Sequence, residues 1–202
     1  MIYLAGCFGC YFGFNFVGAL AYADDVVLLG PTASSMRRML SICDTYALQY
    51  DIVFNAQKSK FVVVCASHFR SFYSLMCKCV FCIGGNQIDN VSSFSHLGHV
   101  INSRLDDSED VLFRRNSFVS QVNNVLCFFG KLDSFVKTKL FKAYCTSMYG
   151  CELWTLADPS VEQFCIAWRK ALRRILDLPH NCHSYLLPLV TDILPAFDEI
   201  IM

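Results

Sequence analysis

The pattern of apolar and polar positions divides the chain into a front half of short strands and a back half of helices. Before residue 105, most apolar runs are short and end at polar or glycine-containing segments, which is typical of strands and hairpins. From residue 106 onward, apolar residues recur at the helical period over long stretches. The pattern predicts an α+β fold, with antiparallel hairpins and one packed helix in residues 1–105 and an all-helical region in residues 106–202.

Two apolar runs near the front of the chain flank a pair of adjacent carboxylates, Asp24 and Asp25. The Phe, Val and Leu residues in these runs favour strands, and a polar break between two such runs is typical of a hairpin. We expect one hairpin over residues 11–30, with its tip near residues 23–25 and both carboxylates at a sheet edge. Mutual repulsion makes such a pair hard to bury uncharged. Mg²⁺ or Mn²⁺, which assist phosphoryl transfer, would offset the repulsion, and a solvated turn is the alternative.

The same reading places further elements along the chain. Apolar residues at helical spacing predict an amphipathic helix over residues 33–50, capped by Thr32 or Ser34, with its apolar face on the sheet. Acidic residues 106–110 are expected to cap a later helix, because negative charge favours a helix N-terminus. The other expected elements are strands near residues 52–54 and 61–64, a hairpin over 80–91, helices near 110–129, 133–149 and 159–177, and short apolar helices after residue 185.

The string Tyr22-Ala23-Asp24-Asp25 between two apolar runs resembles the catalytic hairpin of reverse transcriptases. Residues 17–21 and 26–31 extend the resemblance to the non-LTR (LINE-type) retrotransposon enzymes. The later matching segments are Asn55, Lys58 and Lys60, then Leu97-Gly98, and then residues 123–127, 140–154 and 168–176. The resemblance implies that residues 1–105 form the C-terminal part of the polymerase palm and residues 106–202 a helical thumb or connection region.

The resemblance also implies roles for single residues. Asp24 and Asp25 would be catalytic and would hold Mg²⁺ or Mn²⁺ in the full-length parent enzyme, and Lys58 would lie near the incoming deoxynucleoside triphosphate. On the 159–177 helix, four basic residues spaced to share one side predict a stripe that faces phosphates or solvent. The residues expected to contact the RNA template and DNA primer are Tyr22, Lys60, Leu97, Gly98, Arg169, Lys170, Arg173 and Arg174.

A full enzyme of this family carries fingers and the first half of the palm, with a further Asp, before the hairpin. Only a short stretch precedes the hairpin here. We therefore expect a fragment of an RNA-directed DNA polymerase that belongs to a metal-dependent nucleotidyltransferase but is inactive alone. One alternative is a noncatalytic nucleic-acid-binding remnant. Another is a decayed reading frame without a selected function.

Charge and composition limit these readings. The formal net charge of the 202 residues is zero, so whole-chain charge does not argue for nucleic-acid binding, and a hydrophobic content of 54% excludes a disordered tail. Residues 111–150 nevertheless carry six basic residues against Asp133 alone, which suits either phosphate contacts or a solvated helix face. The six are Arg114, Arg115, Lys131, Lys137, Lys139 and Lys142.

The twelve cysteines are scattered through apolar segments, which favours a reduced, intracellular chain in which free Cys fills the core. Cys-x-x-Cys spacings at residues 7–10 and 79–82 do not complete a standard zinc pattern. The first 23 residues are uncharged. No Lys or Arg precedes the apolar run within them and glycines interrupt it, so neither a signal peptide nor a membrane span is expected. The resemblance treats this stretch as a buried strand pair. A secreted or membrane protein with disulfides is the remaining alternative.

Overall fold

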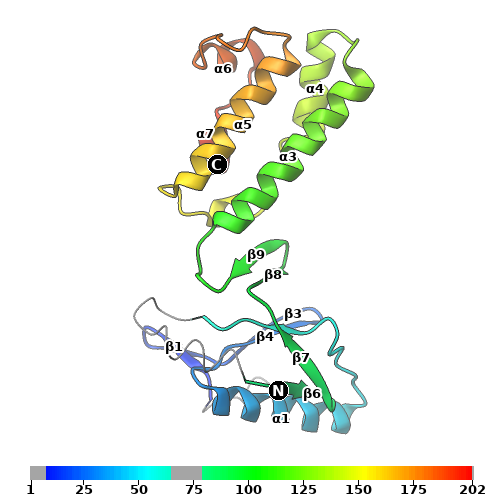
Figure 1. Ribbon diagram of the computed structural model, residues 1–202, viewed down its shortest axis with the longest axis vertical. Coiled ribbons are helices and arrows are strands. Elements are labelled where there is room, and N and C mark those ends of the chain that lie inside the picture. Colours follow the sequence, from blue (N-terminus) through cyan, green and yellow to red (C-terminus); the bar gives the residue numbers. More distant parts are fainter. Residues whose placement is uncertain (1–7, 65–78, 202) are drawn as a thin grey trace. The chain divides into compact units, whose positions relative to one another are not determined.

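The computed structural model describes residues 8–64 and 79–201 (Figure 1). The fold is α+β, as predicted. The chain divides into two units, residues 1–94 and 95–202, and each is described by itself. The predicted boundary after residue 105 falls inside the second unit, behind a hairpin of the strands β8 (Ser93–His96) and β9 (His99–Asn102).

Two hairpins in succession form the front of the first unit. The strand β1 (Cys10–Phe12) pairs with β2 (Asn15–Val17), and β3 (Ala19–Tyr22) pairs with β4 (Asp25–Leu28), both antiparallel and in separate sheets. The predicted tip position is confirmed, but the single hairpin over residues 11–30 is wrong. The chain breaks between β2 and β3 at Gly18, where a Cβ on Gly9 would collide with the Gly18 backbone. Only glycine permits this close approach.

The expectation that these front strands form a buried pair is also wrong. Phe12 is 83% exposed, Phe14 is fully exposed, and Tyr22 is 67% exposed. The reason is that the one described helix of this unit packs mainly against a different sheet. Of the two apolar runs, the second is partly covered: Val26, Val27 and Leu28 on β4 are half-buried, and Leu28 packs against the core beneath α1.

The helix α1 (Ala33–Tyr50) has the predicted bounds. The Thr32 hydroxyl accepts a hydrogen bond from the Ser35 amide at 3.1 Å, which satisfies one donor at the helix start. Leu40 and Cys43 on α1 pack against Phe81 and Ile88, so the helix covers the sheet of β6 (Phe81–Ile83) and β7 (Asn86–Asn90).

This sheet has the order β5-β7-β6 and contains the predicted second hairpin. Gly84 and Gly85, with φ of 56° and 75°, form the tight turn between β6 and β7. The predicted antiparallel hairpins are present, and the strand β5 (Lys60–Phe61) adds a parallel pairing with β7 that was not predicted. The predicted strand near residues 52–54 is absent, because Asp51 ends α1 in a left-handed conformation and no described strand pairs with the irregular segment that follows.

The second unit contains the helices in the back half of the chain. The predicted helices near 110–129 and 159–177 agree with α3 (Ser108–Phe129) and α5 (Pro159–Ile175), but the middle helix is shorter than predicted. It ends at Tyr144, where the Thr146 hydroxyl bonds back to the Lys142 carbonyl and a left-handed Gly150 turns the chain. The remaining helical elements are α4 (Ser134–Tyr144), the 3₁₀ turn η3 (Cys151–Leu153), α6 (Leu186–Thr191) and α7 (Ala196–Ile201).

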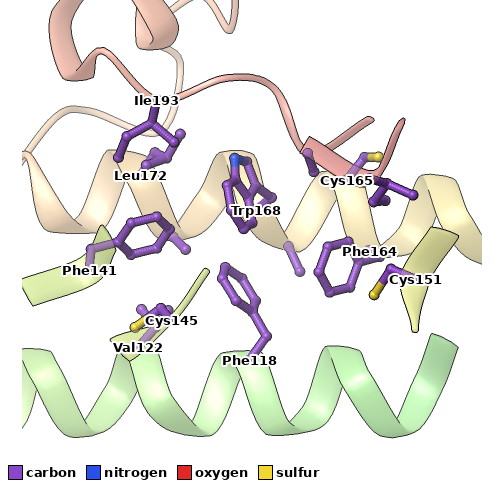
Figure 2. Packing of buried hydrophobic residues seen from close by; sticks show 14 of the residues in the cluster. Phe118, Val122, Phe141, Cys145, Cys151, Phe164, Cys165, Trp168, Leu172 and Ile193 are labelled. Carbon is purple, nitrogen blue, oxygen red and sulfur yellow. The ribbon is translucent and has the colours of Figure 1, made fainter. Parts of the chain in front are cut away.

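An aromatic core joins α3, α4 and α5. Figure 2 shows Phe118 pointing from α3 toward Phe164 and Trp168 on α5, and the rings of Phe118 and Trp168 stack at 5.2 Å. Phe141 from α4 meets the edge of Trp168 at 5.4 Å. Trp168 and Trp154 are 0% and 4% exposed, so both belong to the core. Burying each such ring stabilises the unit by about 1.5–3 kcal/mol.

The cysteines of the described residues are all free thiols. Cys43, Cys145 and Cys165 are buried as expected, whereas Cys127 is exposed and Cys65 lies outside the described residues. Across residues 8–64 and 79–201, no helix combines the length and the apolar character that crossing a bilayer requires.

Candidate functional site

The predicted catalytic carboxylates lie at the tip of the β3–β4 hairpin. Ala23 and Asp24 form the turn, with Ala23 in a left-handed conformation (φ 53°), and Asp25 is the first residue of β4, opposite Tyr22. Asp24, Asp25 and Tyr22 are all exposed. Within the part of the chain that the structure describes, no hydrogen bond or ion pair engages either carboxylate. The hairpin therefore leaves both carboxylates exposed to solvent.

The donor chemistry of this pair suits a hard divalent cation. Mg²⁺ in proteins is held through one or two carboxylates, and waters and substrate phosphates complete its shell. Asp24 and Asp25 meet that minimum. No third His, Cys, Asp or Glu joins them, or gathers into any other metal-binding group, in the described ranges. A cation at the hairpin tip would therefore depend on ligands from outside the described residues.

The Asn55–Lys60 loop is a tight turn that leads into β5. The Asn55 side-chain oxygen accepts a hydrogen bond from the Lys58 amide at 3.1 Å, and the Asn55 carbonyl accepts one from the Ser59 amide at 3.0 Å. Asn55 therefore shapes the loop. The Lys60 ammonium lies 2.6 Å from Asp89 on β7, a partner that the sequence reading missed. Lys58 is exposed and has no side-chain partner among the described residues.

The Leu97-Gly98 segment forms the tip of the β8–β9 hairpin. Both residues are left-handed, with φ of 49° and 80°, and Leu97 is 42% exposed. A Cβ on Gly98 would lie 3.2 Å from the Tyr149 ring, so glycine at this position allows the ring to approach. The Arg114 guanidinium donates a hydrogen bond to the Gly98 carbonyl and fixes the tip against α3.

The acidic segment at the start of α3 contains a buried centre that the sequence reading missed. Asp110 was expected to cap the helix, but its side chain is 0% exposed. It accepts hydrogen bonds from the Val100 amide at 2.9 Å and from the Trp154 indole at 2.7 Å. His99 Nδ1 lies 3.3 Å and Arg114 Nε 3.9 Å from the same carboxylate. The i,i+4 spacing of Asp110 and Arg114 was the only sign of this centre in the sequence.

Asp106 does serve the start of α3. Its carboxylate accepts hydrogen bonds from the Ser108 amide and hydroxyl, and from the Asn102 amide group. Hydrogen bonding from Ser108, and then from Asn102, holds the pKa of Asp106 below its usual range. The acidic segment is thus divided between a cap and a buried structural residue.

The four basic residues of α5 do not form one free stripe. Arg169 lies 2.6 Å from Glu162, Arg173 donates to the Cys182 carbonyl at 2.9 Å, and Arg174 donates to Asn123 on α3 at 2.8 Å. Lys170 is exposed and has no side-chain partner in the described ranges. Three of the four charges are therefore engaged within the second unit, and they point toward different neighbours.

The basic excess of residues 111–150 is partly internal as well. Lys137 is 1% exposed, and its ammonium lies 2.5 Å from Asp177. Arg114 is held between Gly98 and Asp110. Lys139 lies 4.9 Å from the Phe135 ring and remains exposed. A simple sum over the sequence therefore overstates the charge that this segment offers to phosphates.

Two buried thiols could be mistaken for nucleophiles. Burial raises the pKa of Cys145 to about 11 and that of Cys151 to about 12. Both thiols therefore stay protonated at neutral pH, and a protonated thiol is a weak nucleophile and a weak metal ligand. The two cysteines are core residues.

Comparison with known proteins leaves the residues as the basis for any assignment. No protein-family model, no curated protein and no solved structure matches the chain.

Proposed function

We propose that this chain is part of an RNA-directed DNA polymerase of the non-LTR retrotransposon type. The observation that carries the proposal is the tip of the β3–β4 hairpin, where Asp24 and Asp25 are adjacent, exposed and without a partner among the described residues. In this proposal, the first unit supplies the C-terminal part of a palm, and the helices of the second unit supply a thumb or connection region. Nine described free thiols fit a reduced, intracellular setting.

Asp24 and Asp25 would hold the cation, and Lys58 would lie near the incoming triphosphate. Mg²⁺ bound there would stabilise the charge that develops as a primer hydroxyl attacks a nucleotide phosphate. Two carboxylates alone give the cation few protein ligands, so the activity is assigned to an assembly that adds a further Asp. This chain alone is expected not to extend a primer.

The cation site can be tested without any activity. Mn²⁺ is added to ¹⁵N-labelled protein, and the amide signals of residues 22–26 are expected to broaden first, because a paramagnetic ion relaxes nearby nuclei. The variant Asp24→Asn/Asp25→Asn should lose this broadening. Asp198→Asn/Glu199→Gln, which removes an adjacent acidic pair from α7, should keep it. Equal broadening in the wild type and the hairpin variant would refute the assignment.

A primer-extension assay with Mg²⁺, RNA template and DNA primer tests the second part of the proposal. No extension is expected from this chain alone. Extension that Asp24→Ala abolishes would show that two carboxylates are sufficient.

The alternative, a noncatalytic nucleic-acid-binding protein, has weaker support. Arg169, Arg173 and Arg174 are already bonded within the second unit, which leaves Lys170 as the exposed cation of that set. Salt-sensitive binding to a primer-template that survives Asp24→Ala and is lost in Lys170→Gln would favour it.

A further inference from the structure

A hollow of about 560 Å³ lies in the first unit, between the segment that precedes β5 and the start of β7. Residues 53–57, Asn86 and Gln87 line it. Parallel pairing of β5 and β7 explains this arrangement, because the segments that lead into two parallel strands meet at the same end of the sheet. The hollow is therefore built by the fold of this unit.

Four carboxamide side chains contribute to the lining: Asn55, Gln57, Asn86 and Gln87. The Asn55 oxygen is engaged by the Lys58 amide, and the Asn86 nitrogen donates to the Gly84 carbonyl. Each of these two side chains thus keeps its other polar atom available. Gln57 and Gln87 are exposed and form no side-chain hydrogen bond with the described residues. The lining therefore offers both hydrogen-bond donors and acceptors to a ligand.

The rest of the lining is neutral and partly apolar. No acidic or basic side chain contributes to it, and Val53, which is 91% exposed, and the half-buried Phe54 add apolar surface. A ligand that fits is an uncharged, flat group with a donor and an acceptor on one edge. Lys58 follows Gln57 in the chain and is exposed, and its backbone amide donates to Asn55, so a cationic residue adjoins the lining.

We propose that this hollow binds an unpaired nucleobase. A carboxamide pairs through its N–H and C=O with the adjacent donor and acceptor of a base edge, and apolar side chains accept the face of the ring. The adjoining Lys58 favours a base that carries a phosphate over a neutral peptide amide. Asp24 and Asp25 take no part. Lys58 is shared with the proposed polymerase site, so the experiment changes Gln57 and Gln87, which that site does not use, and the two proposals can fail independently.

Fluorescence anisotropy with a labelled single-stranded oligonucleotide, in EDTA, measures this binding. The full chain carrying Asp24→Asn/Asp25→Asn is used as the parent, so that a failure of the hairpin site does not affect the result. Gln57→Ala/Gln87→Ala, at two exposed positions that do not contribute to the core, should weaken binding about tenfold, because several net hydrogen bonds are lost. Gln49→Ala/Gln163→Ala, which removes two exposed glutamines on helices, should leave binding unchanged.

An abasic oligonucleotide of equal length separates the base from the phosphates. It should bind about tenfold more weakly than the normal strand, since it lacks the stacking and hydrogen bonding of the base. AMP distinguishes a free nucleotide from a base within a strand. If AMP binds and Gln57→Ala/Gln87→Ala weakens that binding, the ligand is a free nucleotide. If the oligonucleotide binds and AMP does not, the ligand is a base within a strand. Three results would each overturn the proposal. The first is equal binding of the abasic and the normal strand, and the second is unchanged binding by the Gln57→Ala/Gln87→Ala variant. The third is a shift of the Gln side-chain NMR signals on addition of a peptide amide but not of nucleotides.

Discussion

Replacing Asp110 with asparagine removes the charge from the buried centre of the second unit while keeping its size. The carboxylate accepts from the Val100 amide and the Trp154 indole and lies 3.9 Å from Arg114 Nε. Asparagine offers a single acceptor atom, so one of the two buried donors loses its partner, and the Arg114 guanidinium loses its counter-charge.

The magnitude follows from those contacts. An unsatisfied buried donor costs about 1–3 kcal/mol, and breaking a buried ion pair costs about 3–5 kcal/mol when both charges are close. Arg114 is 18% exposed and keeps its bond to Gly98, so the ion-pair contribution lies below that range. We expect Asp110→Asn to lower the unfolding free energy by about 2–4 kcal/mol.

Urea denaturation followed by tryptophan fluorescence measures this loss, because Trp154 and Trp168 are both in the second unit. Glu109→Gln is the matched control: it removes one negative charge from the same helical turn and should cost about 0.3–1 kcal/mol. Trp154→Phe removes the indole donor and keeps a ring. In a double-mutant cycle, Asp110→Asn and Trp154→Phe should couple by about 1–3 kcal/mol. The stabilising role of Asp110 would be refuted by two results together. Asp110→Asn would lower the unfolding free energy no more than Glu109→Gln does, and the double-mutant cycle with Trp154→Phe would show no coupling energy.

Three further predictions concern the thiols, a helix cap and a turn. In the folded chain, the pKa values of Cys145 and Cys151 are about 11 and 12, whereas the unfolded thiols ionise near pH 9. The stability that the neutral buried thiols contribute is therefore complete below pH 9. It is lost as the pH rises from 9 toward the folded pKa values. Urea melts between pH 8.5 and 10.5 should show a loss of about 1.4 kcal/mol per pH unit for each thiol above pH 9, and Cys145→Ala/Cys151→Ala should flatten the slope; an unchanged slope would contradict this. Hydrogen bonds from Ser160 hold the pKa of Asp158, the N-cap of α5, below its usual range. The stability that Asp158 adds is therefore present above the ordinary Asp pKa and is lost on acidification. In urea melts, Asp158→Ala should lower the unfolding free energy by about 1 kcal/mol at pH 7 and by much less at pH 2.5. Leu97→Gly should raise the melting temperature slightly, because a non-glycine residue in the left-handed conformation costs about 1–2 kcal/mol. The larger loss of backbone entropy when glycine folds cancels part of this gain. A lower melting temperature would contradict the prediction and would mean that the Leu97 side chain stabilises the hairpin tip.

Local rules were sufficient for several elements. The bounds of α1 followed from its apolar period and from Thr32, and the β6–β7 turn followed from two glycines that accept positive φ. The tip of the β3–β4 hairpin followed from a polar break between two apolar runs. In each case the decisive interactions lie within a few residues of one another, so the sequence carries them directly.

The surroundings of the candidate site residues could not be derived in the same way. Asp24, Asp25 and Lys58 were recognised as exposed polar groups, but the pairing of Lys60 with Asp89 depends on a parallel register between strands that are distant in the chain. Likewise, the sequence did not predict that Arg174 donates a hydrogen bond to Asn123, because this contact depends on the packing of α3 against α5. A charge count over the sequence cannot include partners of this kind.

By itself, the sequence determined the α+β class, the order of most elements and the exposed carboxylate pair, because periodicity, caps and turns act over one or two helical turns. Only the tertiary structure decided which apolar runs are covered and which charges are buried. Phe118, Phe141 and Trp168 meet in one core because three helices pack, whereas Phe12 and Phe14 stay exposed because α1 covers another sheet. Asp110 lies 44 residues from Trp154, whose indole donates a hydrogen bond to it. Burying a charged carboxylate is unfavourable unless such partners satisfy it, and the tertiary fold is what brings them into contact.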